Sequence, residues 1–118
     1  MTNWQDDLNE KRRSDGHYGV DLEGSDGWKK LVLEADSMLS FIDPDYKIQQ
    51  VKQKFGGLRF YFGTEKSGVE YSIMYAITEY IESRSRFVCE HCGEFGRLKE
   101  DRKWIMTLCN SCDELITE

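Results

Sequence analysis

Four cysteines near the C-terminal end are the residues of this 118-residue chain best suited to chemistry. They form two Cys-x-x-Cys pairs, Cys89 with Cys92 and Cys109 with Cys112, with sixteen residues between the pairs. A turn of this spacing presents two thiolates at one point, and two such turns complete the tetrahedral sulfur shell that zinc prefers. Because four protein ligands leave no position for water or substrate, the spacing predicts one structural Zn²⁺ and no metal catalysis.

Other arrangements of the cysteines are two disulfides or four inert buried thiols. Nothing else in the chain indicates secretion, so we expect reduced thiols that are available to zinc. His91 lies inside the first pair and is an alternative ligand, but four cysteines already complete the shell. A surface position is therefore expected for this histidine.

The residues around the cysteines predict a knuckle, a hairpin and a short helix. Gly93 follows the first pair, and Asp113 and Glu114 follow the second, where carboxylates suit the positive end of a helix. A knuckle followed by a helix that carries the second pair is the treble-clef arrangement. The polar hairpin between the pairs is either a solvated loop or a source of positive charge for the thiolates, together with two arginines before the first pair. These basic residues are Arg84, Arg86, Arg97, Lys99, Arg102 and Lys103.

This segment resembles the GATA-type zinc fingers. It has their Cys-x-x-Cys-Gly start and an intervening hairpin, and its run from Leu108 to Cys112 is close to their leucine-cysteine-asparagine-alanine-cysteine. The resemblance covers about the last thirty residues and implies the fold of the finger. It departs from those fingers where DNA is read, because the helix begins with acidic residues and no basic tail follows it.

The composition predicts an ordered, acidic domain. The net charge is −6, yet residues 46–88 carry seven basic and four acidic side chains, against five and eleven in residues 1–45 and four and seven in residues 89–118. A chain that is acidic overall is a poor general binder of nucleic acid. The start has neither a basic nor an apolar leader, and no stretch approaches the ~20 apolar residues of a membrane span. We expect a cytoplasmic protein that does not bind membranes.

The patterns predict an α+β fold: a helix, a β-hairpin, a helix and then a C-terminal treble-clef or zinc-ribbon-like finger with four cysteines. Residues 1–25 are expected to form an irregular acidic arm, residues 26–86 the α-β-β-α body, and residues 87–118 the finger, packed as one unit with the body. Asp43-Pro44 should end the first helix, and Ser67 should begin the second. The helical spacing predicts these buried residues: Trp28, Leu31, Val32, Ala35, Met38, Leu39 and Ile42 in the first helix, and Val69, Ile73, Ala76, Ile77, Tyr80 and Ile81 in the second.

Residues 51–62 predict a hairpin whose two-residue turn is Gly56-Gly57. In that register Lys54 lies opposite Arg59, and one face of the hairpin forms a core while the other is basic. The core face holds Val51, Phe55, Leu58, Phe60 and Phe62. The basic face holds Lys52, Lys54, Arg59 and Tyr61, which are the candidate partner-binding residues. Like charges that face each other repel, so we expect an anion nearby, either an internal carboxylate or an external partner.

The hairpin carries a second resemblance. The run from Val51 to Tyr61, between an amphipathic helix and the C-terminal cysteine pairs, is similar to a family of small uncharacterised bacterial and phage proteins. That resemblance would cover most of residues 26–118. It implies an architecture and no activity.

The sequence patterns bear on three classes of function. Catalysis is disfavoured because the cysteines are committed to zinc, and neither His17 nor His91 has an evident partner. A zinc-finger regulator that binds nucleic acid is the second class, favoured by the finger and the basic face. The preferred hypothesis is a small protein-interaction module of the inhibitor, immunity or phage accessory type. Neither its partner nor its oligomeric state follows from the sequence.

Overall fold

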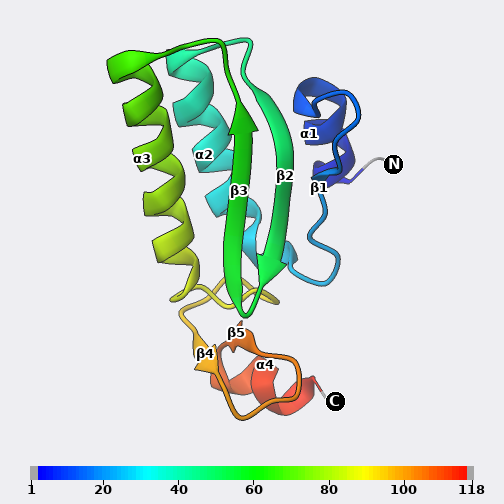
Figure 1. Ribbon diagram of the computed structural model, residues 1–118. Helices are drawn as coiled ribbons and strands as arrows, with labels where there is room; N and C mark the ends of the chain where they lie inside the picture. The colour runs from blue at the N-terminus through cyan, green and yellow to red at the C-terminus, as the bar shows by residue number, and fades with distance from the viewer. Residues whose placement is uncertain (1–2, 117–118) are drawn as a thin grey trace.

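The computed structural model describes residues 3–116 and has the mixed α+β composition that the sequence predicts. Residues 1, 2, 117 and 118, which belong to the predicted arm and finger, lie outside this part. The elements in chain order are α1 (Trp4–Arg12), β1 (Gly19–Val20), the 3₁₀ segment η1 (Asp26–Trp28), α2 (Lys29–Ile42), β2 (Lys47–Lys54), β3 (Gly57–Gly63), α3 (Gly68–Ser85), β4 (Arg97–Lys99), β5 (Met106–Leu108) and α4 (Asn110–Leu115). Strands β1, β2 and β3 form one sheet in that order, and β4 pairs with β5. In Figure 1, α2 and α3 lie on one side of the larger sheet and α1 beside β1, while the C-terminal elements lie at the tip of the β2–β3 hairpin.

Helix α2 agrees closely with the sequence pattern. It follows η1 and ends at Ile42, before Asp43 and Pro44, because a residue that precedes proline is disfavoured in the helical conformation. Trp28 is completely buried, and its indole Nε1 donates a hydrogen bond to the Val88 carbonyl (2.8 Å). Its predicted role as a core anchor is confirmed. Met38, in contrast, is 38% exposed, so the buried stripe is narrower than predicted.

Helix α3 begins after Ser67 as predicted, although the Ser67 side chain makes no capping hydrogen bond. Its predicted buried stripe is partly wrong, because the helix packs against α2 and also leans over β3. Of the predicted stripe only Ile77 and Ile81 are buried, and Met74 and Ser85 are buried in addition. The predicted residues that are exposed instead are Val69 (75%), Tyr80 (52%), Ile73 (48%) and Ala76. Polar side chains therefore occupy the line that contacts the sheet, and aromatic side chains are left at the surface.

The turn of the hairpin is shifted by one residue from its predicted position. Lys54 pairs with Gly57 and Lys52 with Arg59, so Phe55 and Gly56 form the turn. Both have positive φ angles, 53° and 79°, as a type I′ turn requires. Phe55 is 68% exposed and not part of the core. Apart from Phe55, each face of the hairpin keeps its predicted residues. The new register moves each cross-strand partner by two positions, and side chains two positions apart on a strand lie on the same face.

The predicted irregular arm is wrong for residues 4–12, which form helix α1. Its stability comes from polar contacts that apolar periodicity does not reveal, since Leu8 is its only fully buried residue. Asn9 exchanges two hydrogen bonds with the backbone of Val20 (2.7 and 3.1 Å), and Gln5 exchanges two with the backbone of Leu22 (2.8 and 3.2 Å). These amide side chains pair with the outer edge of β1 and of the segment that follows it, as a further strand would.

The opposite edge of the sheet, on β3, is also closed by side chains. The Leu58 backbone N–H donates to Ser85 Oγ (3.0 Å), and the Phe60 N–H donates to Glu82 Oε2 (2.8 Å). Both acceptors lie on α3. The larger sheet therefore presents neither edge as a run of unpaired backbone groups. Within residues 3–116, no helix has the length and apolarity needed to cross a bilayer.

Candidate metal centre and basic face

The four cysteines converge as their spacing predicts. Cys89 and Cys92 lie in the turn after α3, Cys109 is the N-cap of α4, and Cys112 lies in the first turn of that helix. All four Sγ atoms lie within 4.8 Å of one another, and those of Cys92 and Cys109 are 3.8 Å apart. A tetrahedral site with metal–sulfur bonds of about 2.3 Å places its sulfur atoms about 3.8 Å apart, so the four residues fit one metal ion.

The alternative arrangements of the cysteines are contradicted. None of the four forms a disulfide, and only Cys89 and Cys112 are buried. His91 is exposed, and its Nδ1 lies 3.4 Å from Cys112 Sγ, within hydrogen-bonding distance of a ligand sulfur. The described chain therefore offers a shell of four sulfurs with a histidine beside it.

Contacts within the knuckle lower the pKa of one of the four thiols. Burial disfavours the Cys89 thiolate, but backbone N–H groups of Cys109, Cys92 and His91 outweigh it and lower the Cys89 pKa to about 7. Burial and the neighbouring sulfurs raise the pKa of Cys112. A bound cation favours the thiolate at every position, so metal binding releases protons.

The basic side chains near the cysteines mostly have other partners. Arg102 donates to Asp113 Oδ1 (2.6 Å) and to the Ile116 carbonyl (2.9 Å), which ties the loop between β4 and β5 to α4. Arg84 pairs with Glu34 on α2, away from the thiolates. The hypothesis that these two arginines offset the thiolate charge therefore finds no support in their contacts.

Glu90, inside the first Cys-x-x-Cys pair, is a buried residue that the sequence analysis missed. It is 1% exposed, and its carboxylate accepts hydrogen bonds from Ser25 Oγ (3.0 Å), Gln53 Nε2 (3.3 and 3.4 Å) and the Thr107 N–H (2.9 Å). Burial raises its pKa, and these hydrogen bonds oppose that shift. One carboxylate therefore joins the knuckle to the segment before α2, to the hairpin and to β5. Nothing in the local sequence indicates these partners, which are distant along the chain.

The backbone of η1 packs directly against the knuckle. The Gly27 N–H donates to the Glu90 carbonyl (2.8 Å), and a Cβ atom at Gly27 would overlap the Cys89 carbonyl oxygen. Thr107 Oγ1 also donates to the carbonyl of Gly56 in the hairpin turn (2.6 Å). The four-cysteine segment is therefore joined to the body at two points, one before α2 and one at the hairpin tip.

The four predicted partner-binding residues do share one face of the hairpin. Lys52 lies directly opposite Arg59, Lys54 lies two residues further along β2, and Tyr61 lies two residues further along β3. Arg86, which the sequence suggested as one possible source of positive charge for the thiolates, also lies on this face. A Cβ atom at Gly57 would lie 3.5 Å from Arg59 Nη1 and 3.7 Å from Arg86 Nη2, so the two guanidinium groups converge there.

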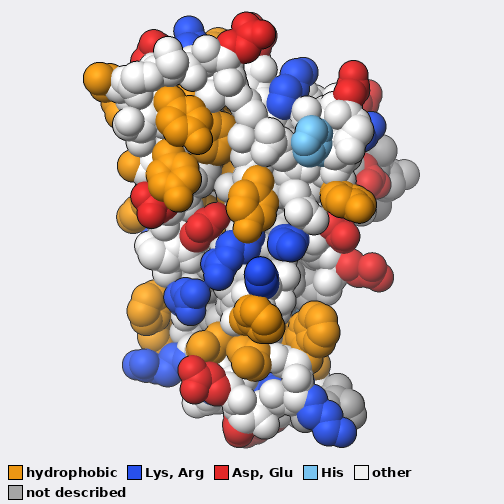
Figure 2. Space-filling model, in the orientation of Figure 1, with side chains coloured by type: hydrophobic (Ala, Val, Ile, Leu, Met, Phe, Trp, Pro, Cys, Tyr) orange, Lys and Arg blue, Asp and Glu red, His pale blue; other side chains and the backbone are white. Residues whose placement is uncertain are grey.

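Exposed aromatic rings surround these cations. Phe55, Tyr61 and Trp104 are 68%, 43% and 70% exposed, and Figure 2 shows hydrophobic side chains around a cluster of Lys and Arg over the hairpin. A hollow of about 300 Å³ separates the hairpin tip from the loop before β5 and is lined by Phe55 and Trp104. We call the whole surface the basic face. Its members are Lys52, Lys54, Phe55, Arg59, Tyr61, Arg86 and Trp104.

The charges of the basic face are not balanced by ion pairs within residues 3–116. In the part of the chain that the structure describes, the ion pairs involve Arg12, Lys66, Arg84 and Arg102, and none of the four cations of the basic face. The proposed internal carboxylate partner is therefore not found among residues 3–116.

No protein-family model, curated protein or solved structure matches this chain. The two resemblances noted from the sequence therefore rest on the motifs themselves.

Proposed function

We propose that this protein is a small, non-enzymatic, zinc-stabilised interaction module that acts in the cytoplasm by binding an acidic surface of a partner protein. The inhibitor, immunity and phage accessory types belong to this class. The observation that carries the proposal is the basic face, which combines three exposed aromatic rings with four cations that make no ion pair in the described part of the chain.

Zinc is the metal that the four-sulfur shell suits best, because soft thiolates and tetrahedral geometry favour it over harder cations. We assign the segment from Cys89 to Ile116 to the treble-clef class. Its knuckle, its β4–β5 hairpin and the position of Cys112 in the first turn of α4 support this assignment. The zinc is structural, and its role is to hold the loop that carries Trp104.

The composition of the basic face suits protein recognition. Trp, Tyr and Arg are the residues that most often dominate the energy of protein interfaces, and they do so where water is excluded. Unpaired lysines around them steer an acidic partner towards the surface before contact. The metal-held loop and the hairpin tip each contribute, so recognition depends on both parts of the molecule.

A second candidate is the binding of single-stranded nucleic acid. The observation that favours it is the alternation of exposed rings with cations on one surface, since bases stack on such rings while cations track the phosphates. The net charge of −6 opposes this function.

One experiment separates the two candidates. The zinc-loaded protein is used to capture partners from its native cytoplasm, with and without nuclease, beside a Lys52→Glu/Arg59→Glu variant. We expect a stoichiometric protein that survives nuclease treatment and is lost with the variant. Lys29→Glu/Lys30→Glu is the matched control, because both lysines are exposed on α2 and make no ion pair in the described chain.

Recovery of nucleic acid alone, with nothing left after digestion, would instead favour the second candidate. Its affinity should then fall with rising salt in step with the phosphates that the lysines and arginines neutralise. Capture that is unchanged by the charge reversals would contradict both candidates for this face.

A further inference from the structure

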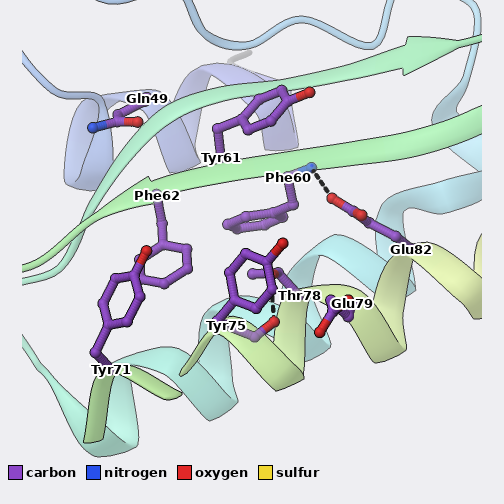
Figure 3. A pocket seen from close by; sticks show the side chains of 9 residues that line it. All are labelled: Gln49, Phe60, Tyr61, Phe62, Tyr71, Tyr75, Thr78, Glu79 and Glu82. Atoms are coloured by element: carbon purple, nitrogen blue, oxygen red, sulfur yellow. Dashed lines mark hydrogen bonds between the residues drawn. The ribbon is translucent and has the colours of Figure 1, made fainter. Parts of the chain in front are cut away.

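A second recess lies between β3 and α3 and meets the basic face at Tyr61. Its volume is about 220 Å³, and its walls come from the outer edge of the hairpin and from one side of the helix. Figure 3 shows Phe62, Tyr71 and Tyr75 around it, while Tyr61 points to the other side of the strand. We call this recess the aromatic cleft.

The rings of the cleft are ordered against one another and open to solvent. The centroids of Phe62 and Tyr71 are 5.8 Å apart, and those of Tyr71 and Tyr75 are 6.5 Å apart in a stacked arrangement. Tyr71 and Tyr75 are 45% and 52% exposed. Among residues 3–116, the cations that lie over aromatic rings lie over Tyr46, Phe55, Tyr80 and Phe95. The electron-rich faces of the cleft rings therefore have no cation from the described chain.

Two carboxylates of α3, Glu79 and Glu82, line the same cleft. Glu82 uses one oxygen to accept the hydrogen bond from Phe60, and Glu79 makes no hydrogen bond or ion pair in the described chain. The remaining carboxylate of α3, Glu70, pairs with Lys66. The cleft therefore combines negative charge with exposed rings, the reverse of the basic face.

We propose that the aromatic cleft receives an arginine side chain of the partner protein. A guanidinium group is planar, stacks on tyrosine and donates parallel hydrogen bonds to a carboxylate, so it matches the rings and Glu79 together. An anion would be repelled by the two carboxylates, and an apolar group would bury them without a partner. Lysine supplies the charge without the planar fork.

The inference that this arginine belongs to a partner protein rests on the proposed function. Tyr61 belongs to the basic face and also borders the cleft. A partner that covers both surfaces would present an acidic patch with an arginine beside it. The two surfaces together then fix the orientation of the partner, because a reversed complex would place like charges against each other.

The test uses N-acetyl-arginine methylamide as the probe and the intact, zinc-loaded protein, followed by NMR. We expect saturable shifts in Phe62, Tyr71 and Tyr75 with a dissociation constant in the range of about 1–10 mM, as for one small contact. The capped forms of lysine and of citrulline, which keeps the shape of arginine without its charge, should bind at least about tenfold more weakly.

Glu79→Gln removes the free carboxylate from an exposed position without a folding role, and it should weaken probe binding by about tenfold. Tyr75→Leu removes a ring and should weaken it by a similar factor. Glu23→Gln is the matched control, since Glu23 is exposed outside the cleft, and it should leave binding unchanged. The proposal is overturned if no saturable shift is found up to about 50 mM, if citrulline binds as well as arginine, or if Glu79→Gln has no effect.

The outcome is independent of the basic face. The Lys52→Glu/Arg59→Glu variant should lose the partner protein and still bind the arginine probe. If the native protein binds its partner through the basic face but does not bind the probe, the cleft proposal is wrong and the proposed function stands. If the probe binds and the charge reversals leave partner capture intact, the function assigned to the basic face is wrong.

Discussion

The body and the four-cysteine segment of this protein are held together in different ways. Among residues 3–116, sixteen buried apolar residues form one cluster across α1, α2, α3 and the larger sheet. The cluster of the four-cysteine segment has three buried residues in the same range, and two of these, Cys89 and Cys112, belong to the four cysteines that could hold a metal ion. The body can be stabilised by apolar burial, whereas the core of the segment is so small that we expect its stability to depend on a bound metal.

The difference matters because the basic face spans both parts. Its cations come from the body, and Trp104 comes from the loop that the cysteines hold. The contacts of Glu90, Gly27 and Thr107 connect the two parts. Changes in the metal site, the core and these connecting contacts should therefore have separable effects.

Loss of the metal should have the largest effect. Apparent binding free energies of structural zinc sites are about 10–16 kcal/mol near pH 7, so Cys112→Ser or chelation should unfold the four-cysteine segment. We expect NMR resonances of residues 89–116 to collapse while those of α2 and α3 persist. Ser111→Ala, between the ligands of the second pair, is the control and should retain one zinc per chain by mass spectrometry. A folded protein that holds no zinc and survives chelation unchanged would contradict the assignment.

Truncation in the body core should have the next largest effect. Leu39 is completely buried, and Leu39→Ala should lower the free energy of unfolding by about 2–5 kcal/mol. Leu33→Ala on the same helix removes a side chain that is 39% exposed and should cost less than about 1 kcal/mol. Urea denaturation followed by circular dichroism measures both. Equal costs would show that α2 packs differently from the arrangement described above.

A methyl group between the two parts should have a smaller effect. Gly27→Ala places a Cβ atom against the knuckle backbone, and overpacking of this kind costs about 1–3 kcal/mol. Gly57→Ala is the control, because its new Cβ atom would meet only ordinary contacts. The rate at which a chelator removes zinc should rise for Gly27→Ala and stay unchanged for the control. A normal rate for both variants would mean that the contact of η1 with the knuckle does not support the metal site.

The smallest expected effect is at the hairpin tip. Thr107→Val keeps the shape of the side chain and removes the hydrogen bond to the Gly56 carbonyl, at a cost of about 1 kcal/mol. Amide hydrogen exchange in the turn should become faster, because the turn loses its link to β5. Thr64→Val, which removes the hydrogen bond to Asp43 at the other end of the hairpin, is the comparison and should leave exchange at the tip unchanged.

The sequence predicts best what is local or what depends on spacing. The convergence of the cysteines follows from two turns of fixed spacing, the end of α2 from Asp43-Pro44, and the outer position of Lys52 and Arg59 from strand alternation. These features need little knowledge of partners that are distant along the chain. The finger class, the zinc and the function stay predictions.

The errors occur where polar side chains act over a distance. Helix α1 was missed because Asn9 and Gln5 stabilise it through the backbone of Val20 in β1 and of Leu22 just after it, and hydrophobic periodicity does not record such bonds. The turn was misplaced because tertiary contacts of Gly56 with the β4–β5 hairpin compete with the local preference for Gly-Gly. Glu90 was missed because a charged residue is expected at the surface unless its partners are known.

The closed edges of the larger sheet have a consequence for which substitutions this protein can accept during evolution. Amide side chains close the edge of β1, and the Ser85 hydroxyl and the Glu82 carboxylate close that of β3. New substitutions on the basic face leave these groups in place and so do not create a strand edge at which copies of the chain could pair. Glu82 also lines the aromatic cleft, so diversification of the cleft must keep this one carboxylate or free the N–H of Phe60 at the edge of β3.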